Sequence, residues 1–555
     1  MTNRVSVSTN IARVQSTMQS WPLTIAAILR HACAVNGDRV VTTATGQGGY
    51  RSTTYRELGE QTARLAHGLR GLGITGDQRV GTFMWNNAEH LAVYLAVPAM
   101  GAVLHTLNIR LAAEQIAFIA DEAEDQIIVA DASLIPLLAP VLPLLSTVHT
   151  VIIAGDGDTG PLDDAGVTVL RYADVLAGQP GQFDWPDVDE NSAAAMCYTS
   201  GTTGNPKGVV YSHRSTYLHS LTACTASALD VGSDDVVLPI VPMFHANAWG
   251  LAYAALMAGA DLVMPDRFLD GASLIELIES RRPTVAGAVP TIWNDVMHCL
   301  ERSPGHDVSS LRLVACGGSA VPLSLMQTFE QQHGVYIQQA WGMTETSPLA
   351  TVAKPLPGVT EDRHWVMRTT QGRPMCGVEV RVVDDAGDPV PTDGESVGEL
   401  EVRGPWITGG YYLGRDAEKF DGGWLRTGDV GRIDADGFVT LTDRAKDVIK
   451  SGGEWISSVE LENHLIGHPG VLEAAVVGVP DDKWQERPLA VVVLQEGASH
   501  APEELREFLA DKVVRWWLPE RWTFVDQVPR TSVGKYDKKT IRARHAAGDY
   551  EITTV

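Results

Sequence analysis

The stretch YTSGTTGNPKG, from Tyr198 to Gly208, decides how the rest of this sequence is interpreted. It follows the apolar run AAAMC and contains three glycines, four Ser or Thr hydroxyls and one lysine. Loops with accessible backbone N–H groups and hydroxyls suit phosphate oxygens, because each group donates to the anion without steric bulk. An ordinary surface turn is the alternative interpretation, so the loop is a phosphate-site hypothesis that other parts of the chain must support.

The loop is not the common nucleotide-binding sequence GxxxxGK[ST]. Counting from Gly201, the second glycine position holds Pro206 and the Ser/Thr position holds Gly208. The spacing instead resembles the signature loop of the adenylate-forming superfamily, the acyl-CoA synthetases, luciferases and peptide-synthetase adenylation domains. Five further motifs of that superfamily follow in the family's order: CGGSAVP from Cys316, WGMTETSP from Trp341, WLRTGDVGRID from Trp424, DRAKDVIKSGGEWISSVELE from Asp443 and PRTSVGKYDKK from Pro529. The resemblance spans almost the whole chain and is nearest to the fatty acyl-CoA synthetases.

Length and charge restrict the class of protein. A chain of 555 residues is too long for one ordinary core, so at least two domains are expected. The 45% hydrophobic and 20% charged shares are ordinary for a soluble globular protein. The net charge of -25 disfavours nonspecific attraction to nucleic acid or to anionic membranes, so no nucleic-acid partner is expected. A polyanionic ligand therefore needs a local positive site.

Cysteine usage and hydropathy point to a cytoplasmic protein. The six cysteines show neither CxxC spacing nor the density of a disulfide scaffold, which favours reduced thiols. The first residues lack the apolar core of a secretory signal. The longest apolar run, from Leu91 to Leu104, is shorter than the ~20 residues of a membrane span and contains Pro98. We expect a buried helix and turn there, and no transmembrane segment.

The order of sequence patterns predicts an α/β fold. Helical patterns alternate with short apolar strands over residues 53–191 and again over 212–341, which favours parallel sheets flanked by helices. Residues 377–442 show alternating runs broken by turns, typical of a small antiparallel β subdomain. The last ~110 residues suffice for a small α+β domain.

We therefore predict a large N-terminal adenylation domain, residues 1–443, built of layered βα subdomains plus the small antiparallel β subdomain. Residues 444–555 are expected to form a small mobile α+β C-terminal domain, with a hinge near residues 443–447. The resemblance implies that this domain carries a catalytic lysine.

The resemblance also implies a reaction in two halves. A carboxylate attacks the α-phosphate of ATP and expels pyrophosphate, and the thiol of coenzyme A then attacks the acyl adenylate and expels AMP. The first half brings two anions together, so it needs positive charge and hydrogen-bond donors more than a protein nucleophile. The implied cofactors are ATP, Mg²⁺ and CoA, and related fatty acyl ligases imply a homodimer.

Family motifs assign residues to the phosphates. Thr344 would contact the α-phosphate, and Glu345 and Thr199 would hold Mg²⁺, because a hard cation prefers oxygen ligands. The loop would hold the β- and γ-phosphates and follow pyrophosphate out. Its assigned residues are Thr199, Ser200, Gly201, Thr202, Thr203, Gly204 and Lys207.

Other motifs are assigned to adenosine. Trp341 would stack on adenine through its flat apolar face, with an ordinary core tryptophan as the alternative. Asp429 resembles the carboxylate that accepts both ribose hydroxyls, and Arg444 a second ribose contact. The strip of mostly small residues around adenine comprises Gly317, Gly318, Ser319, Ala320, Gln339, Ala340, Gly342 and Met343.

Lys535 matches the family's catalytic lysine, a compact charge that bridges the attacking carboxylate and the α-phosphate. The C-terminal domain would supply this lysine for the first half-reaction and then swing away, with Lys446 at the hinge. The nearby cations Lys538, Lys539, Arg542 and Arg544 are interpreted as solvated or as helpers of the CoA phosphates. The pantetheine channel would be formed by Ser451, Gly452, Gly453, Glu454 and Trp455.

The segment VPMFHANAWG, from Val241 to Gly250, says most about the acid. By resemblance, His245 and Gly342 lie beside the acyl carboxylate, and Trp249 is the gating tryptophan of fatty acyl-CoA synthetases, or else a structural one. No Lys or Arg occurs from residue 231 to 266, so this wall offers no cation for a second carboxylate.

The segment therefore favours an apolar acid, of medium or long chain, over an amino acid or a dicarboxylate. Each methylene contributes only about 1 kcal/mol in an apolar pocket, so chain length stays open. Thioether or aromatic acids, a carrier protein as acyl acceptor, and a nucleotide-binding protein without catalysis are the alternatives.

Overall fold

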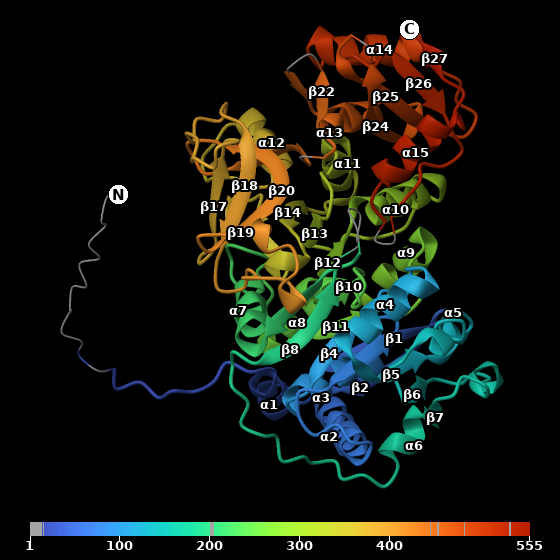
Figure 1. The fold of residues 1–555 in the computed structure, drawn as a ribbon, viewed down its shortest axis with the longest axis vertical. Helices are drawn as coiled ribbons and strands as arrows, with labels where there is room; N and C mark the ends of the chain where they lie inside the picture. Colours follow the sequence, from blue (N-terminus) through green and yellow to red (C-terminus); the bar gives the residue numbers. More distant parts are fainter. Residues whose placement is uncertain are drawn as a thin grey trace.

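The computed structural model describes residues 14, 16–199, 205–444, 446–451, 454–481, 483–531 and 534–555, without the side chains of residues 454 and 455. These residues form four β-sheets that follow one another broadly along the chain (Figure 1). The predicted α/β class is confirmed, with large parallel or mixed sheets first and smaller antiparallel or mixed ones after them.

The seven-stranded sheet has the order β7-β6-β5-β3-β4-β8-β9 and is parallel except for the pair β8–β9. The antiparallel pair β8–β9 lies at one edge of this sheet, and the chain between the two strands is the phosphate-loop candidate. Its strands are β3 Arg79–Phe83, β4 Val103–Thr106, β5 Asp125–Asp131, β6 Thr150–Ala154, β7 Thr168–Arg171, β8 Ala193–Tyr198 and β9 Gly208–Ser212.

The nine-stranded sheet has the order β16-β15-β14-β13-β12-β10-β11-β1-β2. Its central strands β14, β13, β12, β10, β11 and β1 are parallel, and antiparallel strands flank them. The strands are β1 Val40–Gly46, β2 Gly49–Thr54, β10 Val236–Pro239, β11 Asp261–Met264, β12 Val285–Ala288, β13 Leu313–Gly317, β14 Ile337–Gly342, β15 Leu349–Val352 and β16 Arg373–Pro374.

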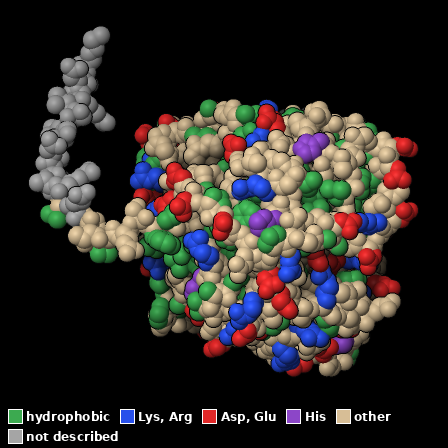
Figure 2. All heavy atoms as spheres, turned by 90° about the horizontal axis from the view of Figure 1, so that it is seen from below, with side chains coloured by type: hydrophobic (Ala, Val, Ile, Leu, Met, Phe, Trp, Pro, Cys, Tyr) green, Lys and Arg blue, Asp and Glu red, His purple; other side chains and the backbone are tan. Residues whose placement is uncertain are grey.

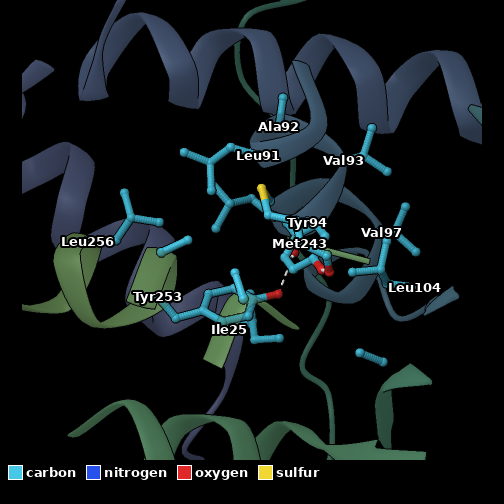
Figure 3. Packing of buried hydrophobic residues seen from close by; sticks show 14 of the residues in the cluster. Ile25, Leu91, Ala92, Val93, Tyr94, Val97, Leu104, Met243, Tyr253 and Leu256 are labelled. Atoms are coloured by element: carbon cyan, nitrogen blue, oxygen red, sulfur yellow. Dashed lines mark hydrogen bonds between the residues drawn. The ribbon is translucent and has the colours of Figure 1, made fainter. Parts of the chain in front are cut away.

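A layer of helices lies between these two sheets. Helix α3 (Ala88–Ala99) contacts β3, β4 and β8 on one side and β1 on the other, and α8 (Leu251–Ala258) contacts β10 and β11. Every residue of α3 except Glu89 is buried, which explains its nearly uniform hydrophobicity. Figure 3 shows Tyr94 of α3 beside Tyr253 of α8, whose hydroxyl donates to the Tyr94 carbonyl at 2.9 Å. The apolar run singled out in the sequence is therefore a central helix that leads into β4, as predicted.

Alternating side chains of each strand face two different helical layers. In β5, Ile127 and Val129 join the central cluster, whereas Ile128 and Ala130 face the outer helices. The remaining helices of the large domain are α1 Ile25–Val35, α2 Tyr55–Gly71, α4 Ala113–Ala123, α5 Ile135–Leu138, α6 Tyr172–Leu176, α7 His213–Ala223, α9 Gly271–Arg281, α10 Pro290–Arg302, α11 Leu323–His333 and α12 Glu361–Thr369.

The predicted antiparallel subdomain is a five-stranded sheet. Its strands are β17 Glu379–Val383, β18 Gly398–Arg403, β19 Phe420–Asp421, β20 Trp424–Ile433 and β21 Val439–Arg444. Strands β20 and β21 pair so that Asp429 lies opposite Arg444. This register brings the RTGD and DRAKD motifs together.

The last sheet is six-stranded and packs with its own helices at the top of Figure 1. Its core contains Trp522, which is fully buried. Its strands and helices are β22 Ile449–Ser451, β23 Glu454–Ile456, β24 Val471–Asp481, β25 Gln485–Leu494, β26 Arg521–Phe524, β27 Thr553–Thr554, α13 Ser458–Ile466, α14 Pro502–Ala510 and α15 Lys538–Ala547.

The surface carries charges of both signs. Figure 2 shows one face on which Lys and Arg side chains are interspersed with Asp and Glu. Within the described part of the chain, no helix combines the length and the apolar character needed to cross a bilayer.

Candidate active site

The described neck of the phosphate-loop candidate is held by two hydrogen bonds. The Thr199 N–H donates to the Lys207 carbonyl at 2.9 Å, and the Lys207 N–H donates to the Thr199 hydroxyl at 3.2 Å. Thr199 and Lys207 therefore face each other where β8 and β9 open into the loop. The assigned residues Ser200, Gly201, Thr202, Thr203 and Gly204 lie outside the described residues.

Lys207 contacts a segment of the antiparallel subdomain. Its ammonium forms an ion pair with Asp416 and lies 5.4 Å from the ring centroid of Tyr411. The Tyr411 hydroxyl in turn donates to Glu345 Oε1 at 2.5 Å. The lysine assigned to pyrophosphate and the carboxylate assigned to Mg²⁺ are thus joined through one tyrosine.

Glu345 and Thr344 lie on a short 3₁₀ turn, Thr344–Thr346, directly after β14. Glu345 is 6% exposed, and the turn is fixed because the Tyr211 hydroxyl donates to the Thr344 carbonyl at 2.7 Å. The described residues contain no group of three or more His, Cys, Asp or Glu side chains able to enclose a metal. One buried carboxylate fits Mg²⁺, which is usually held by one or two carboxylates together with water and substrate phosphates.

The ribose candidates form a cluster in which Asp429 is buried and Arg444 is half-buried. Asp429 is 2% exposed and receives the Trp341 indole N–H at 2.9 Å through Oδ2, while its Oδ1 lies 3.1 Å from Arg444 Nε. The Asp429 carboxylate raises the pKa of the Arg444 guanidinium. Trp341 is only 6% exposed and packs in the apolar cluster beneath the antiparallel subdomain, so only a small part of its indole is open to a ligand.

The adenine strip lies at the ends of β13 and β14. Gly317 closes β13 so near to β14 that a Cβ there would lie 2.6 Å from the Ala340 carbonyl oxygen, and Gly318 has φ +87°. A Cβ on Gly342 would overlap the Pro348 carbonyl. Glycine is therefore required here by the backbone itself.

The side chain of Gln339 is used within the protein. Its Oε1 accepts from the Val321 N–H at 2.6 Å, and its Nε2 donates to the carbonyls of Thr369 and Thr370. It holds the strip in place, and both Nε2 protons are used, so donation by this amide to a nucleotide would break an existing hydrogen bond. Ser319 is exposed, whereas Ala320, Ala340 and Met343 are half-buried.

Lys535 reaches this cluster from the C-terminal sheet. Its backbone closes a turn with Thr531, and its Cε lies 3.5 Å from where a Cβ of Gly318 would be. Burial lowers the pKa of Lys535 to about 8, with Arg444 acting in the same direction and Asp429 and Glu345 opposing. Gly318 and Lys535 are thus brought together although they are more than 200 positions apart in the chain.

His245, assigned to the acyl carboxylate, lies near Lys535 of this cluster. Burial lowers its pKa to about 4, with further lowering by Lys535 and Arg110, so the imidazole is neutral near pH 7. Arg110 lies 6.0 Å from the ring centroid of Phe244. The segment itself holds no cation, as the sequence states, but the fold brings this arginine to it from the loop after β4.

Two family models match the sequence. The model described as "AMP-binding enzyme" matches residues 29–412, more than half of the chain, and "AMP-binding enzyme C-terminal domain" matches residues 460–535. The chain belongs to the AMP-binding enzymes.

Relatives of this AMP-binding enzyme are named CoA ligases. The 3-methylmercaptopropionyl-CoA ligase of Ruegeria pomeroyi is 42% identical over 95% of this chain and 98% of its own length. The long-chain-fatty-acid–CoA ligase of Thermus thermophilus is 44% identical over 96% and 97%. The crystal structure of the anthranilate CoA ligase AuaEII with anthranoyl-AMP has a TM-score of 0.86 at 24% identity, covering 95% of this chain and 99% of that one, and supports the fold alone.

The structure describes only some of the residues that were predicted to form the pantetheine channel for CoA. Ser451 is buried, and its hydroxyl accepts from Arg487 at 3.1 Å. Glu454 and Trp455 lie in β23, paired with β22, while Gly452 and Gly453 fall outside the described residues. Burial lowers the pKa of Lys446, whose carbonyl accepts from Arg542.

The interpretation of the lysine and arginine side chains at residues 538–544 as solvated is wrong for Lys538. Lys538 is not solvated, because its ammonium lies 2.8 Å from Glu462 Oε1 with both side chains largely buried. Arg542 lies 2.8 Å from Asp447. Both contacts span segments distant in the sequence, so the lysine-rich composition alone could not reveal them.

The motifs missed several residues that touch the site. Tyr411 and Asp416 contact Glu345 and Lys207 from the loop before β19, Asn247 lies inside the segment Val241 to Gly250 and accepts from Cys197, and Arg110 lies over Phe244 of that segment. The sequence feature that could have drawn attention to Tyr411 is the run GGYY, residues 409–412. The partners of the other residues become visible only in the folded chain.

Proposed function

We propose that this AMP-binding enzyme is an ATP-dependent acyl-CoA ligase that activates an apolar carboxylic acid, a fatty acid of medium or long chain. It forms acyl-AMP with release of pyrophosphate and then transfers the acyl group to CoA with release of AMP. The observation that carries the proposal is the convergence of Lys535, Glu345, Asp429 and Arg444 beside His245. Acyl-CoA ligases of this family use ATP, Mg²⁺ and CoA.

In the first half-reaction, the protein supplies charge at the two ends of the reacting phosphate chain. Lys535 balances the negative charge that accumulates as the carboxylate approaches the α-phosphate, and Thr344 donates to that phosphate. Lys207 and the loop hold the leaving pyrophosphate, which requires Lys207 to exchange Asp416 for phosphate oxygens. Asp429 and Arg444 hold the ribose, and Trp341 presents its small exposed part to adenine.

Glu345 and Thr199 are the residues proposed to hold Mg²⁺, with Tyr411 orienting the carboxylate. When bound, the ion neutralises phosphate charge. His245, neutral near pH 7, adds no charge at the acyl carboxylate, so the positive charge comes from Lys535.

For the second half-reaction, we propose that residues 444–555 rotate about residues 443–447 and bring Ser451 to Trp455 to the adenylate. The boundary and the rotation are predictions. A carrier protein as acceptor is the second candidate for this half, and CoA is favoured because the relatives are named CoA ligases.

The acid is proposed from the apolar wall around Trp249 and from relatives named for a thioether acid and for long-chain fatty acids. The two relatives are named for different acids, yet their sequence identities to this chain are similar. Sequence identity therefore does not decide between a thioether acid and a long-chain fatty acid. Thioether and aromatic acids therefore belong in the test.

The test measures AMP and CoA thioester formation with a graded series of saturated acids and with thioether, aromatic and branched acids. Lys535→Ala is expected to abolish acid-dependent ATP–pyrophosphate exchange while keeping much of the transfer from preformed acyl adenylate to CoA. Equal loss of both halves would refute the domain rotation, and absence of AMP release with every acid would refute ligase activity. Trp249→Ala is expected to alter acid preference more than the KM for ATP.

We further propose a cytoplasmic homodimer, supported only by the unpaired state of all six cysteines and by analogy with related fatty acyl ligases. Light scattering after size-exclusion chromatography decides the oligomeric state. A mass near 60 kDa would refute the dimer, because one chain is 59.8 kDa.

A further inference from the structure

The turn from Ala246 to Gly250 has an unusual backbone. Its five consecutive residues, four of which are not glycine, all have positive φ: 42°, 51°, 50°, 57° and 71°. Residues with a Cβ normally visit this left-handed region singly, because the Cβ approaches the following carbonyl oxygen. A run of this kind persists only where surrounding groups hold it in place.

Asn247 provides the side-chain anchor inside the turn. It is 5% exposed, and its Oδ1 lies 3.3 Å from both the Tyr94 hydroxyl and the Cys197 thiol, which act as donors. The Tyr94 hydroxyl has one proton, which it shares between Asn247 Oδ1 and the closer carbonyl of Met243, just before the turn. Asparagine suits this position because it tolerates the left-handed region better than most residues and offers an acceptor.

The anchor connects the turn to the seven-stranded sheet. Cys197 directly precedes Tyr198 at the end of β8, where the phosphate-loop candidate begins. Its Sγ lies 3.2 Å from the Thr106 hydroxyl, at the end of β4, and that hydroxyl donates to the Phe244 carbonyl at 3.3 Å. The network is buried, so it is not replaced by bulk water when one member is removed.

The turn determines where the Trp249 indole lies. A Cβ added to Gly287 would lie 3.6 Å from Trp249 Cε3, and one added to Gly317 would lie 3.9 Å from Cη2. The indole therefore covers the ends of β12 and β13, so close that a Cβ on either glycine would touch it. At the end of the turn, Gly250 passes so close to His219 that a Cβ would lie 2.6 Å from its Nδ1.

We propose that Asn247 is a positioning residue for acid selection. Its amide oxygen, held by Tyr94 and Cys197, fixes the left-handed turn, and the turn fixes the Trp249 indole against β12 and β13. This inference rests on the proposed ligase function and assigns its acid selectivity to a residue that need not touch the acid.

The test compares kcat/KM for a short and a long saturated acid in matched variants. Asn247→Gly keeps the left-handed backbone accessible and removes the amide, whereas the control Ala248→Gly also relaxes the backbone but leaves the amide in place. We expect Asn247→Gly to change the long-to-short ratio about fivefold or more, in favour of the long acid, while Ala248→Gly leaves it within about twofold. The KM for ATP stays within about twofold in both.

Three variants test the partners of Asn247, and they also serve if Asn247→Gly folds poorly. Tyr94→Phe removes one donor at nearly constant volume and is expected to shift the ratio in the same direction. Cys197→Ser keeps a donor and should preserve the ratio, whereas Cys197→Ala should shift it. Thermal unfolding of each variant separates loss of folded protein from a change in selectivity.

The inference is overturned if Asn247→Gly lowers kcat/KM for all acids by one common factor, or if Ala248→Gly shifts the ratio equally. Both results would require an active wild-type enzyme, and they leave the ligase function intact. A wild-type enzyme that releases no AMP with any acid refutes the proposed function, and this inference with it.

Discussion

Replacing Lys535 with arginine is expected to remove the alkaline limit of the first half-reaction. Burial lowers the pKa of Lys535 to about 8, so its ammonium, the form that stabilises the reacting phosphate, is lost as pH rises through that value. The guanidinium of arginine stays charged over the whole accessible range. The two side chains differ in shape, so we expect a much slower variant whose rate no longer falls above pH 8.

The size of the effect follows from the titration. With a pKa of about 8, roughly 90% of Lys535 is charged at about pH 7 and roughly 10% at about pH 9, whereas an ordinary lysine would remain more than ~90% charged at both. The wild-type kcat/KM for adenylation should therefore fall roughly tenfold between these pH values. Lys535→Arg should lose on the order of 100-fold in rate, because its fork places the charge differently.

The assay is acid-dependent ATP–pyrophosphate exchange at subsaturating ATP, since kcat/KM reports the free enzyme, in which Lys535 has this pKa. Transfer from preformed acyl adenylate to CoA, measured in the same buffers, is the control and should not decline with the same midpoint. The reasoning fails if wild-type exchange stays flat to about pH 9.5, or if Lys535→Arg shows the same alkaline decline.

Two further substitutions probe contacts in the candidate active site, and a third probes the core of the last sheet. Trp341→Phe removes the indole N–H that Asp429 accepts and should raise the KM for ATP roughly tenfold. If the ribose contact is responsible, the variant and the wild type should have similar KM values for 3′-deoxy-ATP. Tyr411→Phe should raise the Mg²⁺ concentration for half-maximal rate about tenfold, because Glu345 loses its orienting hydroxyl, and an unchanged Mg²⁺ response would contradict this. Trp522→Ala should cost about 3–5 kcal/mol of unfolding free energy in urea, and a cost below ~1 kcal/mol would contradict its place in the core.

A candidate site residue could be predicted from the sequence where a short local motif contains it. Asp429 and Arg444 belong to motifs on adjacent antiparallel strands, and the strand register then places them opposite each other. Gly317 and Gly342 were assigned to the adenine strip by resemblance, and the structure adds that close backbone approach excludes any other residue there.

Residues whose environment depends on distant segments could not be predicted. Lys538 looked like one cation among several near the end of the chain, yet Glu462 of another helix buries it. Asp416 carries no motif, and its pairing with Lys207 exists only because the antiparallel subdomain lies against the phosphate-loop strands. Asn247 stands in a segment that otherwise reads as an apolar wall, and its left-handed conformation is a tertiary effect.

The ends of β12 and β13 lie close to both Lys535 and Trp249. On one side, Lys535 lies over Gly318, and its turn approaches so closely that a Cβ on Gly534 would lie 3.6 Å from the Thr291 hydroxyl. On the other side, the Trp249 indole lies against Gly287 and Gly317. If the acid binds under the indole, as proposed, its carboxylate would lie at the strand ends, near the lysine charge. Because one backbone edge serves both contacts, a change in the acyl pocket should affect the rate of adenylation as well as acid affinity.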